Sequence, residues 1–388
     1  MPSLARILVV LTSLLFGPLV ALADDLPQDT NTIKILTPEQ ARKLVANLRS
    51  DYLSLNGLTK LDANTARALA ESKANALHLN GLKTIDSDTG KLLGEFKAQA
   101  LELAGLTALD KHTAEAITKF EGIALKLNGL TTLDTDTAKV LAEFKGPWLS
   151  LEGLTALDAG SVQALADYRG EILCLRLSGL DAATANALTE LKVQVLSIRG
   201  LTTLDADDAQ ALAAFRGDVL GLDGLAALDA DTARTLSRLK VDELSLNGLK
   251  TIDTDTAKAL AEFKGRSLSL GGLTTLDIDT VMAVTAYAGE LNIGHRAARR
   301  FIQTQPFNKD TALAHAALGN GELPRVKAFE SPDSVAIATA LAALVEKRDV
   351  AIPLIETLEF IPEPDGSTTE DFVIPDWLEA QQRTAGSP

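Results

Sequence analysis

The chain repeats one motif ten times, roughly L-x-L-x-G-L-T-x-L-D-x-D-T-A-x-A-L-A-x-F-K-G, and this repetition constrains its fold more than any other feature. Seven of the nine intervals between the motif glycines are 24 residues, and the two exceptions are 26 and 21. A period of this size predicts a solenoid, because each repeat is too small to bury its own apolar side chains and must stack on its neighbours. The motif glycines are Gly57, Gly81, Gly105, Gly129, Gly153, Gly179, Gly200, Gly224, Gly248 and Gly272.

Each repeat reads as a short strand, a turn, a short helix and a return loop. In the fourth repeat, Leu125 and Leu127 alternate with polar neighbours, which indicates a strand with one buried face. Gly129 marks the turn, where a Cβ would interfere. The acidic residue before the helix is expected to be its N-cap, which predicts ten structural caps. These are Asp62, Asp86, Asp110, Asp134, Asp158, Asp181, Asp205, Asp229, Asp253 and Asp277.

The helix of each repeat is predicted to be short and to bury one stripe. In the fourth repeat Ala138, Leu141 and Phe144 lie three residues apart, so they fall on one side of a helix. Lys145 is expected in the last helical turn, and Gly146 is expected to be the C′ residue that ends the helix.

This pattern resembles the leucine-rich repeats of exported bacterial proteins over residues 33–293. The resemblance implies an α/β fold: a right-handed, horseshoe-shaped solenoid with a parallel sheet on its concave face and short helices on its convex face. The chain departs from the usual consensus because its asparagines stand directly before the glycine, two residues early. We therefore expect the Asp and Thr columns, rather than a buried asparagine ladder, to satisfy the turn backbone. The displaced residues are Asn56, Asn80, Asn128 and Asn247.

The spacing is irregular in the middle of the array. Relative to the motif, two residues are added before Leu175 and three are missing after Leu180. The change could kink the array, or it could be drift that packing tolerates. We favour drift, because insertions in repeat folds map to loops.

The two ends of the chain differ from the repeats. Arg6, a short apolar stretch and an Ala21-Leu22-Ala23 cleavage site predict a secretory signal peptide and a mature start at Asp24, with an uncleaved anchor as the alternative. We therefore expect an exported protein that is periplasmic, secreted or located on the cell surface. The predicted segments are a signal peptide (1–23), an N-terminal capping half-repeat (24–50), ten repeats (51–293), and degenerate repeats with a C-terminal cap (294–388).

Composition excludes several partners. The formal net charge is −15 at pH 7, so the chain repels phosphate backbones and a nucleic-acid partner is not expected. No apolar run after the signal peptide is long enough to span a bilayer. Cys174 is the single cysteine, so no intrachain disulfide can form.

The larger side chains of the predicted concave face are concentrated near its centre. Lys126 and Arg176 are expected between paired leucines, Glu152 and Arg199 directly after them, and Trp148 directly before a pair. An exposed Trp beside Arg is typical of a binding hot spot, so these five residues are a candidate site for a protein or glycan ligand. The alternative is a solvated polar sheet face with scattered charges.

No catalytic residue, metal ligand or cofactor site is predicted. The four histidines (His78, His112, His295 and His315) are far apart and lack metal-ligand spacing. No phosphate-binding or dinucleotide motif is present. The stacked Asp residues could attract Ca²⁺, but helix capping explains them without a metal.

The sequence thus favours an exported, non-enzymatic interaction scaffold that binds a protein or a glycan on its concave face. One alternative is an enzyme with its chemistry in residues 294–388 and repeats that position the substrate. Another is a structural envelope or surface protein without a specific ligand.

Overall fold

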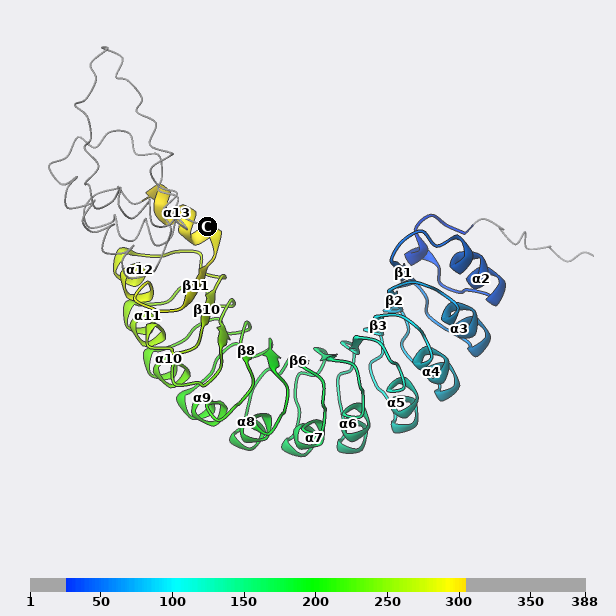
Figure 1. Ribbon diagram of the computed structural model, residues 1–388, viewed down its shortest axis with the longest axis horizontal. Coiled ribbons are helices and arrows are strands. Elements are labelled where there is room, and N and C mark those ends of the chain that lie inside the picture. Colours follow the sequence, from blue (N-terminus) through cyan, green and yellow to red (C-terminus); the bar gives the residue numbers. More distant parts are fainter. Residues whose placement is uncertain (1–25, 305–388) are drawn as a thin grey trace, which may run out of the picture. The chain divides into compact units, whose positions relative to one another are not determined.

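The computed structural model describes residues 26–304 of the chain. The predicted signal peptide, and the part of the predicted C-terminal cap that follows Thr304, lie outside the described residues. Eleven strands form a parallel sheet in which the strand order follows the chain order. Helices alternate with these strands and lie on one side of them, as Figure 1 shows. The predicted α/β solenoid class with a parallel sheet is therefore confirmed.

The strands are three or four residues long, and the helices have seven to ten residues. The strands are β1 (Tyr52–Ser54), β2 (Ala76–His78), β3 (Ala100–Glu102), β4 (Ala124–Lys126), β5 (Trp148–Leu151), β6 (Ile172–Leu175), β7 (Val195–Ile198), β8 (Val219–Gly221), β9 (Glu243–Ser245), β10 (Ser267–Leu270) and β11 (Glu290–Ile293). After the 3₁₀-helix η1 (Thr30–Thr32), the helices are α2 (Pro38–Asn47), α3 (Ala63–Ala70), α4 (Ser87–Gly94), α5 (Lys111–Ile117), α6 (Thr135–Leu141), α7 (Ala159–Leu165), α8 (Ala182–Thr189), α9 (Ala206–Leu212), α10 (Ala230–Leu236), α11 (Thr254–Ala261), α12 (Ile278–Val284) and α13 (His295–Thr304).

The chain divides into two compact units. Within the described residues, the first comprises 26–131 and 144–149, and the second comprises 132–143 and 150–304. Strands β1 to β4 and helices α2 to α5 lie in the first unit, whereas β6 to β11 and α6 to α13 lie in the second. Strand β5 begins in the first unit and ends in the second.

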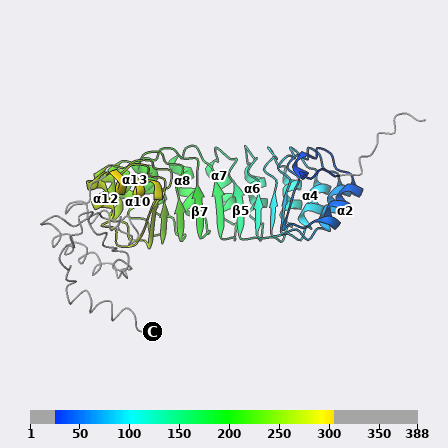
Figure 2. The same ribbon diagram turned by 90° about the horizontal axis from the view of Figure 1, so that it is seen from above.

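A line of leucines on the helix-facing side of the strands forms the core of each unit. In the first unit Leu53, Leu77, Leu101 and Leu125 are register partners from β1 to β4, and all are buried. The corresponding line of the second unit begins at Leu173. Figure 2 shows the strands of each unit lying side by side and pointing in the same direction. This is the shared apolar core that the 24-residue period predicts.

The register of β6 corrects the predicted position of the irregularity. Leu173 pairs with Leu196, and Leu175 pairs with Ile198, so Leu173 and Leu175 are the paired leucines of the sixth repeat. The placement of two added residues before Leu175 was therefore wrong. Leu175 follows its counterpart Leu151 by the usual 24 residues.

The irregularity is instead a single missing residue in the turn of the sixth repeat. Leu151 precedes the cap Asp158 by seven residues, whereas Leu175 precedes the cap Asp181 by six. Gly179 accordingly does not occupy the place of the other motif glycines, because a Cβ added there would meet no atom within 4 Å.

Each of the ten motif aspartates is the N-cap residue of a helix. In α6, for example, Asp134 Oδ1 accepts a hydrogen bond of 2.8 Å from the Thr137 backbone N–H. That bond is the main reason why the pKa of Asp134 lies below its ordinary value. The third helical residue, usually Thr, is buried, and its hydroxyl reaches the preceding repeat in several helices. Thr256 Oγ1 donates to Leu228 O at 3.2 Å, and Ser161 Oγ donates to Leu133 O at 3.1 Å.

The expectation that Gly146 ends its helix was wrong. Helix α6 ends at Leu141, and its C-cap Ala142 keeps a right-handed helical backbone. Gly146 lies further on, in the return loop, where a Cβ would stand 2.3 Å from Phe144 Cζ and 2.3 Å from Gly122 O. The glycine is thus needed because the aromatic ring two residues earlier packs over it.

Asp208 takes the buried Thr place in α9, which gives one repeat an unfavourable charge. Its pKa is raised by burial and by the nearby carboxylates of Asp205, Asp181 and Asp207. We expect Asp208→Thr to stabilise the chain by about 1 kcal/mol at pH 7, because the change removes this repulsion and restores a hydroxyl. Urea unfolding midpoints would measure the gain.

The same substitution has a defined pH dependence. Because folding raises the pKa of Asp208, its ionised form is the destabilising one. The advantage of Asp208→Thr should therefore be full above the raised pKa and should shrink as the pH falls through it. An advantage that stays constant, or that grows in acid, would contradict this explanation.

Candidate binding surface

The sheet face that points away from the helices, here called the open face, carries the outward side chains of the strands (Figure 1). Successive strand residues point to opposite faces, so residues on either side of the buried leucines lie on the open face. Lys126 on β4 occupies such a position, in register with Glu102 on β3. Arg176 was expected in the same column as Lys126, but the register places Cys174 there, paired with Ser197.

Five open-face side chains of the first unit form one continuous line of contacts, which we call the strip: Tyr52, His78, Glu102, Lys126 and Trp148. The Tyr52 and His78 rings are stacked, with centroids 5.9 Å apart and planes 10° from parallel. His78 Nε2 lies 3.8 Å from Glu102 Oε2, and Lys126 Nζ lies 2.5 Å from Glu102 Oε1. Lys126 Nζ also lies 5.2 Å from the centre of the Trp148 ring, a cation–π contact. Each contact joins neighbouring repeats.

Glu102 is the electrostatic centre of the strip. Its side chain is only 19% exposed. Burial raises the pKa of its carboxyl, but the hydrogen bond from Lys126 and the charges of His78 and Lys126 outweigh burial, so the pKa lies below its ordinary value. The carboxylate therefore stays ionised and holds its two neighbours in place.

The other three predicted patch residues belong to the second unit. Arg199 Nη1 and Glu152 Oε1 form an ion pair of 3.1 Å. Arg176 is exposed and follows the paired Leu175, as Arg199 follows Ile198, so it shares the column of Glu152 and Arg199. The five predicted residues thus fall into two clusters, Lys126 with Trp148 in one unit and Glu152, Arg176 and Arg199 in the other.

An asparagine ladder runs along the open face. The sequence predicts that the Asp and Thr columns, without such a ladder, hydrogen-bond the turn backbone. Asn56 Oδ1 accepts the backbone N–H of Asn80 at 3.1 Å, and Asn80 Oδ1 accepts that of Ala104 at 2.9 Å. In the second unit, Asn247 Oδ1 accepts the Gly271 N–H at 2.6 Å. The displaced asparagines therefore bridge successive repeats, alongside the Thr hydroxyls.

The remaining polar residues of the described part suggest no second site. His112 lies 3.5 Å from Glu115 on α5, whereas His78 belongs to the strip, and His315 lies outside the described residues. Cys174 is buried and forms no disulfide. Within residues 26–304, no group of three His, Cys, Asp or Glu side chains is placed to hold a metal ion. No helix of that part is both long and apolar enough to cross a bilayer.

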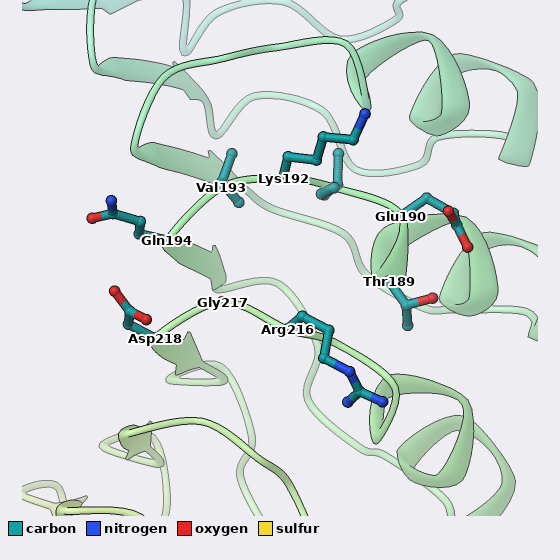
Figure 3. A pocket seen from close by; sticks show the side chains of 9 residues that line it. Thr189, Glu190, Lys192, Val193, Gln194, Arg216, Gly217 and Asp218 are labelled. Atoms are coloured by element: carbon teal, nitrogen blue, oxygen red, sulfur yellow. The ribbon is translucent and has the colours of Figure 1, made fainter.

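A cavity of about 310 Å³ lies in the second unit between two successive return loops (Figure 3). Leu191 and Val193 line it from one loop, and Arg216, Gly217 and Asp218 line it from the next. Leu191 stands where most repeats have Phe or Tyr. The cavity is thus associated with a smaller core residue, and its rim carries charges of both signs.

These repeats, with their paired leucines, parallel strands and capped helices, define the chain as a leucine-rich-repeat-like α/β solenoid. No protein-family model matches the sequence, and no curated protein matches it. Among solved structures, the chain is similar to one from the Toll–Spätzle complex of Drosophila, with 15% identity over 66% of this chain and 40% of that chain and a TM-score of 0.36. A second similar structure is the TLR13–ssRNA13 complex, with 18% identity over 62% of this chain and 39% of that chain and a TM-score of 0.36.

The chain therefore spans about two fifths of the length of these two structures. Similarity at this level concerns the fold alone and carries no information about the ligand. The assignment of the fold rests on the repeats of the chain itself.

Sequence reasoning selected Lys126 and Trp148 but passed over Tyr52, His78 and Glu102. Tyr52 directly precedes the first paired leucine of its repeat, as Trp148 does in the fifth. Comparing the same strand position in every repeat could have identified it. The contacts from His78 to Lys126 follow from the register, because these residues are partners on three adjacent strands.

Proposed function

We propose that the chain is an exported, non-enzymatic scaffold that binds a protein or a glycan on the open face of its sheet. The observation that carries this proposal is the strip, in which side chains from five consecutive repeats contact one another in a single line. Contact of large aromatic side chains with water is unfavourable, so covering the aromatic side chains at the two ends of the strip would favour binding. Trp and Tyr often contribute most of the binding free energy at interfaces.

The internal pairing of the strip also supports binding. Glu102 contacts both His78 and Lys126, and Lys126 in turn covers one face of the Trp148 ring. Long side chains that are already ordered lose little conformational entropy when a ligand arrives. A sheet that presents ordered aromatic rings is suited to ligand binding, and binding alone accounts for the strip without a catalytic reaction.

Export is part of the proposal and rests on residues 1–23 of the sequence. If the chain is exported and cleaved as we propose, the protein isolated from its natural host begins at Asp24. Intact-mass measurement and N-terminal sequencing would show this start. An unprocessed chain in the cytosolic fraction would contradict the export proposal without affecting the binding proposal.

Binding can be tested by capture from the exported fraction of the host. We expect the immobilised full chain to retain one protein or glycan, and Trp148→Ala to retain at least about tenfold less, because aromatic hot spots typically contribute more than 1 kcal/mol. Lys258→Ala is the matched control, because Lys258 is an exposed residue on helix α11 whose partner Asp255 is on the same helix. Because the proposed scaffold is non-enzymatic, the mass of the retained ligand should not change during incubation with the chain.

Three outcomes would contradict the proposal. In the first, the chain retains nothing specific. In the second, the Lys258 variant loses the ligand as fully as the Trp148 variant does. In the third, the chain converts the ligand to a product. The first outcome favours a purely structural protein, the second a site on the helices, and the third an enzyme.

A further inference from the structure

We infer that the strip binds an uncharged glycan, laid across strands β1 to β5 between Tyr52 and Trp148. This inference rests on the proposed function, because it names the class of ligand for the same face.

The charges of the strip are already satisfied within it. Glu102 lies 2.5 Å from Lys126 and 3.8 Å from His78, so its carboxylate already has two partners. Lys126 is shared between that carboxylate and the Trp148 ring. The whole chain carries a formal charge of −15, which opposes an acidic polymer. Charge complementarity therefore favours a ligand without charge.

The strand position of Tyr52 and Trp148 holds only alanine on the strands between them. Tyr52, Ala76, Ala100 and Ala124 are register partners from β1 to β4. The backbone N–H of Trp148 donates to Ile123 O at 3.0 Å. The backbone N–H groups of Ala76, Ala100 and Ala124 make the equivalent bond, so Trp148 is aligned with them. Four strand spacings of about 4.8 Å separate the backbone positions of Tyr52 and Trp148, or roughly 19 Å. This span accommodates a short oligosaccharide.

The side chains along this line have the chemistry that sugars use. Tyr52 is 56% exposed, so the ring at that end is available to stack on the C–H face of a sugar. Glu102 is the open-face residue that follows Ala100 on β3, and Asn80 lies two residues beyond His78 of β2. Their side-chain oxygens already accept bonds within the chain, but each has a second lone pair that can accept a sugar hydroxyl.

An extended peptide fits this surface less well. A peptide that adds to a sheet needs an edge strand with open backbone groups. Strands β2, β3 and β4 are paired on both sides, so their backbone groups are already bonded. The cavity beside Leu191 belongs to the second unit, and no strip residue lines it. A glycan needs neither an edge nor a deep pocket, because it can stack on the exposed Tyr52 ring and on the uncovered part of the half-buried Trp148 ring.

Trp148 provides a direct reporter. The sequence contains two tryptophans, Trp148 and Trp377, so Trp377→Phe leaves Trp148 as the sole source of tryptophan fluorescence. The full chain with this change is titrated with neutral di- and tetrasaccharides of glucose, mannose, galactose and N-acetylglucosamine. We expect at least one tetrasaccharide to shift the Trp148 emission and to protect it from acrylamide quenching. The matching disaccharide should bind more weakly, because it cannot reach both rings.

Calorimetry on chains that retain Trp377 measures the affinity for the tetrasaccharide directly. Trp148→Ala and Tyr52→Ala should each weaken tetrasaccharide binding by at least about tenfold. Trp148→Tyr, which retains a ring, should keep most of the affinity, and this distinguishes lost stacking from a failure to fold. Ser267→Ala is the matched control, because Ser267 occupies the same strand position on β10, and it should bind as the unchanged chain does.

Several results would overturn the inference. One is that no neutral tetrasaccharide binds, and another is that Trp148→Ala binds as well as the unchanged chain. A sulfated or carboxylated glycan that binds more tightly than every neutral one would show that the charge argument is wrong. If a captured protein is lost on Trp148→Ala while no glycan binds, the proposed scaffold function stands and only the glycan assignment falls. If neither class of ligand depends on Trp148, both fall.

Discussion

Replacing Gly224 with alanine is expected to destabilise the second unit by about 3 kcal/mol, whereas the same change at Gly179 should leave its stability nearly unaltered. A Cβ at Gly224 would lie 2.2 Å from Arg199 O and 2.5 Å from Leu201 O. Both are backbone atoms of the preceding repeat, so no side-chain rotation relieves the clash. A Cβ at Gly179 would meet no atom within 4 Å.

The two variants form a matched pair because they make the same chemical change within one unit. Circular dichroism during urea unfolding would compare their midpoints with that of the unchanged chain. Repeat arrays can unfold in parts, so Gly224→Ala should also broaden the transition or split it. Equal midpoints for the two variants would show that close contact between repeats does not explain the motif glycine.

Much of the fold could be predicted because each repeat carries its own local signals. The paired leucines indicate a one-sided strand, and the following Asp supplies the cap of a helix. Leu125 and Asp134 illustrate both: the leucine is fully buried, and the aspartate accepts the Thr137 N–H at 2.8 Å. These features depend on residues close together in sequence, and ten copies of the motif make them unmistakable.

The errors arose where the answer depends on contacts between repeats. Aligning the repeats on glycine placed Gly179 with the other motif glycines, although no neighbouring atom lies near its Cβ position. The register of β6 with β7 shows that the leucines were the better guide. The motif predicts Gly146 as a helix terminus, because helices often end at a glycine. Its actual neighbour is the Phe144 ring, a contact that depends on how the return loop folds.

In the candidate site, too, single residues could be predicted from the sequence, whereas contacts between repeats were harder to predict. Trp148 and Lys126 could be selected because large or charged side chains are rare on this face. The shared column of His78, Glu102 and Lys126 follows from the register, but the stacking of Tyr52 on His78 and the contact of Lys126 with Trp148 could not be predicted, because both depend on the direction of the side chains. The ion pair of Arg199 with Glu152 likewise joins two strands that are not neighbours in the sheet.

In the return loops, the type of residue at one position is linked to the type of residue two positions later. Seven repeats have Phe or Tyr at the end of the helical half of the motif, and in six of them a glycine follows two residues later. Two other repeats have Leu at the aromatic position, and both have Val at the glycine position. The glycine pairs are Phe120–Gly122, Phe144–Gly146, Tyr168–Gly170, Phe215–Gly217, Phe263–Gly265 and Tyr287–Gly289, the exception is Phe96–Ala98, and the valine pairs are Leu191–Val193 and Leu239–Val241. At Gly122, Gly146, Gly217 and Gly265, a Cβ would approach the Phe ring to 2.2–2.4 Å, and at Gly289 it would approach the Tyr287 hydroxyl to 2.5 Å.

This pairing predicts that Leu191 and Val193 can be exchanged only together. Leu191→Phe alone should destabilise the chain by about 2 kcal/mol, because the new ring would meet the Val193 side chain. Val193→Gly alone should cost about 2 kcal/mol, since it removes a buried side chain and makes the loop more flexible. The double variant should approach the stability of the unchanged chain, because a ring over a glycine is the arrangement of the next repeat, at Phe215 and Gly217.

Urea unfolding of the four chains gives a double-mutant cycle, and we expect a favourable coupling free energy of about 2–3 kcal/mol between the two positions. The ring should also reduce the cavity of about 310 Å³ beside Leu191, so a crystal structure of the double variant provides a second readout. Leu188→Phe with Val193→Gly is the control cycle, since Leu188 is buried in α8 outside the return loop. Additive effects at positions 191 and 193 would mean that the aromatic–glycine pairs arose by repetition of the sequence alone, without a packing requirement to preserve them.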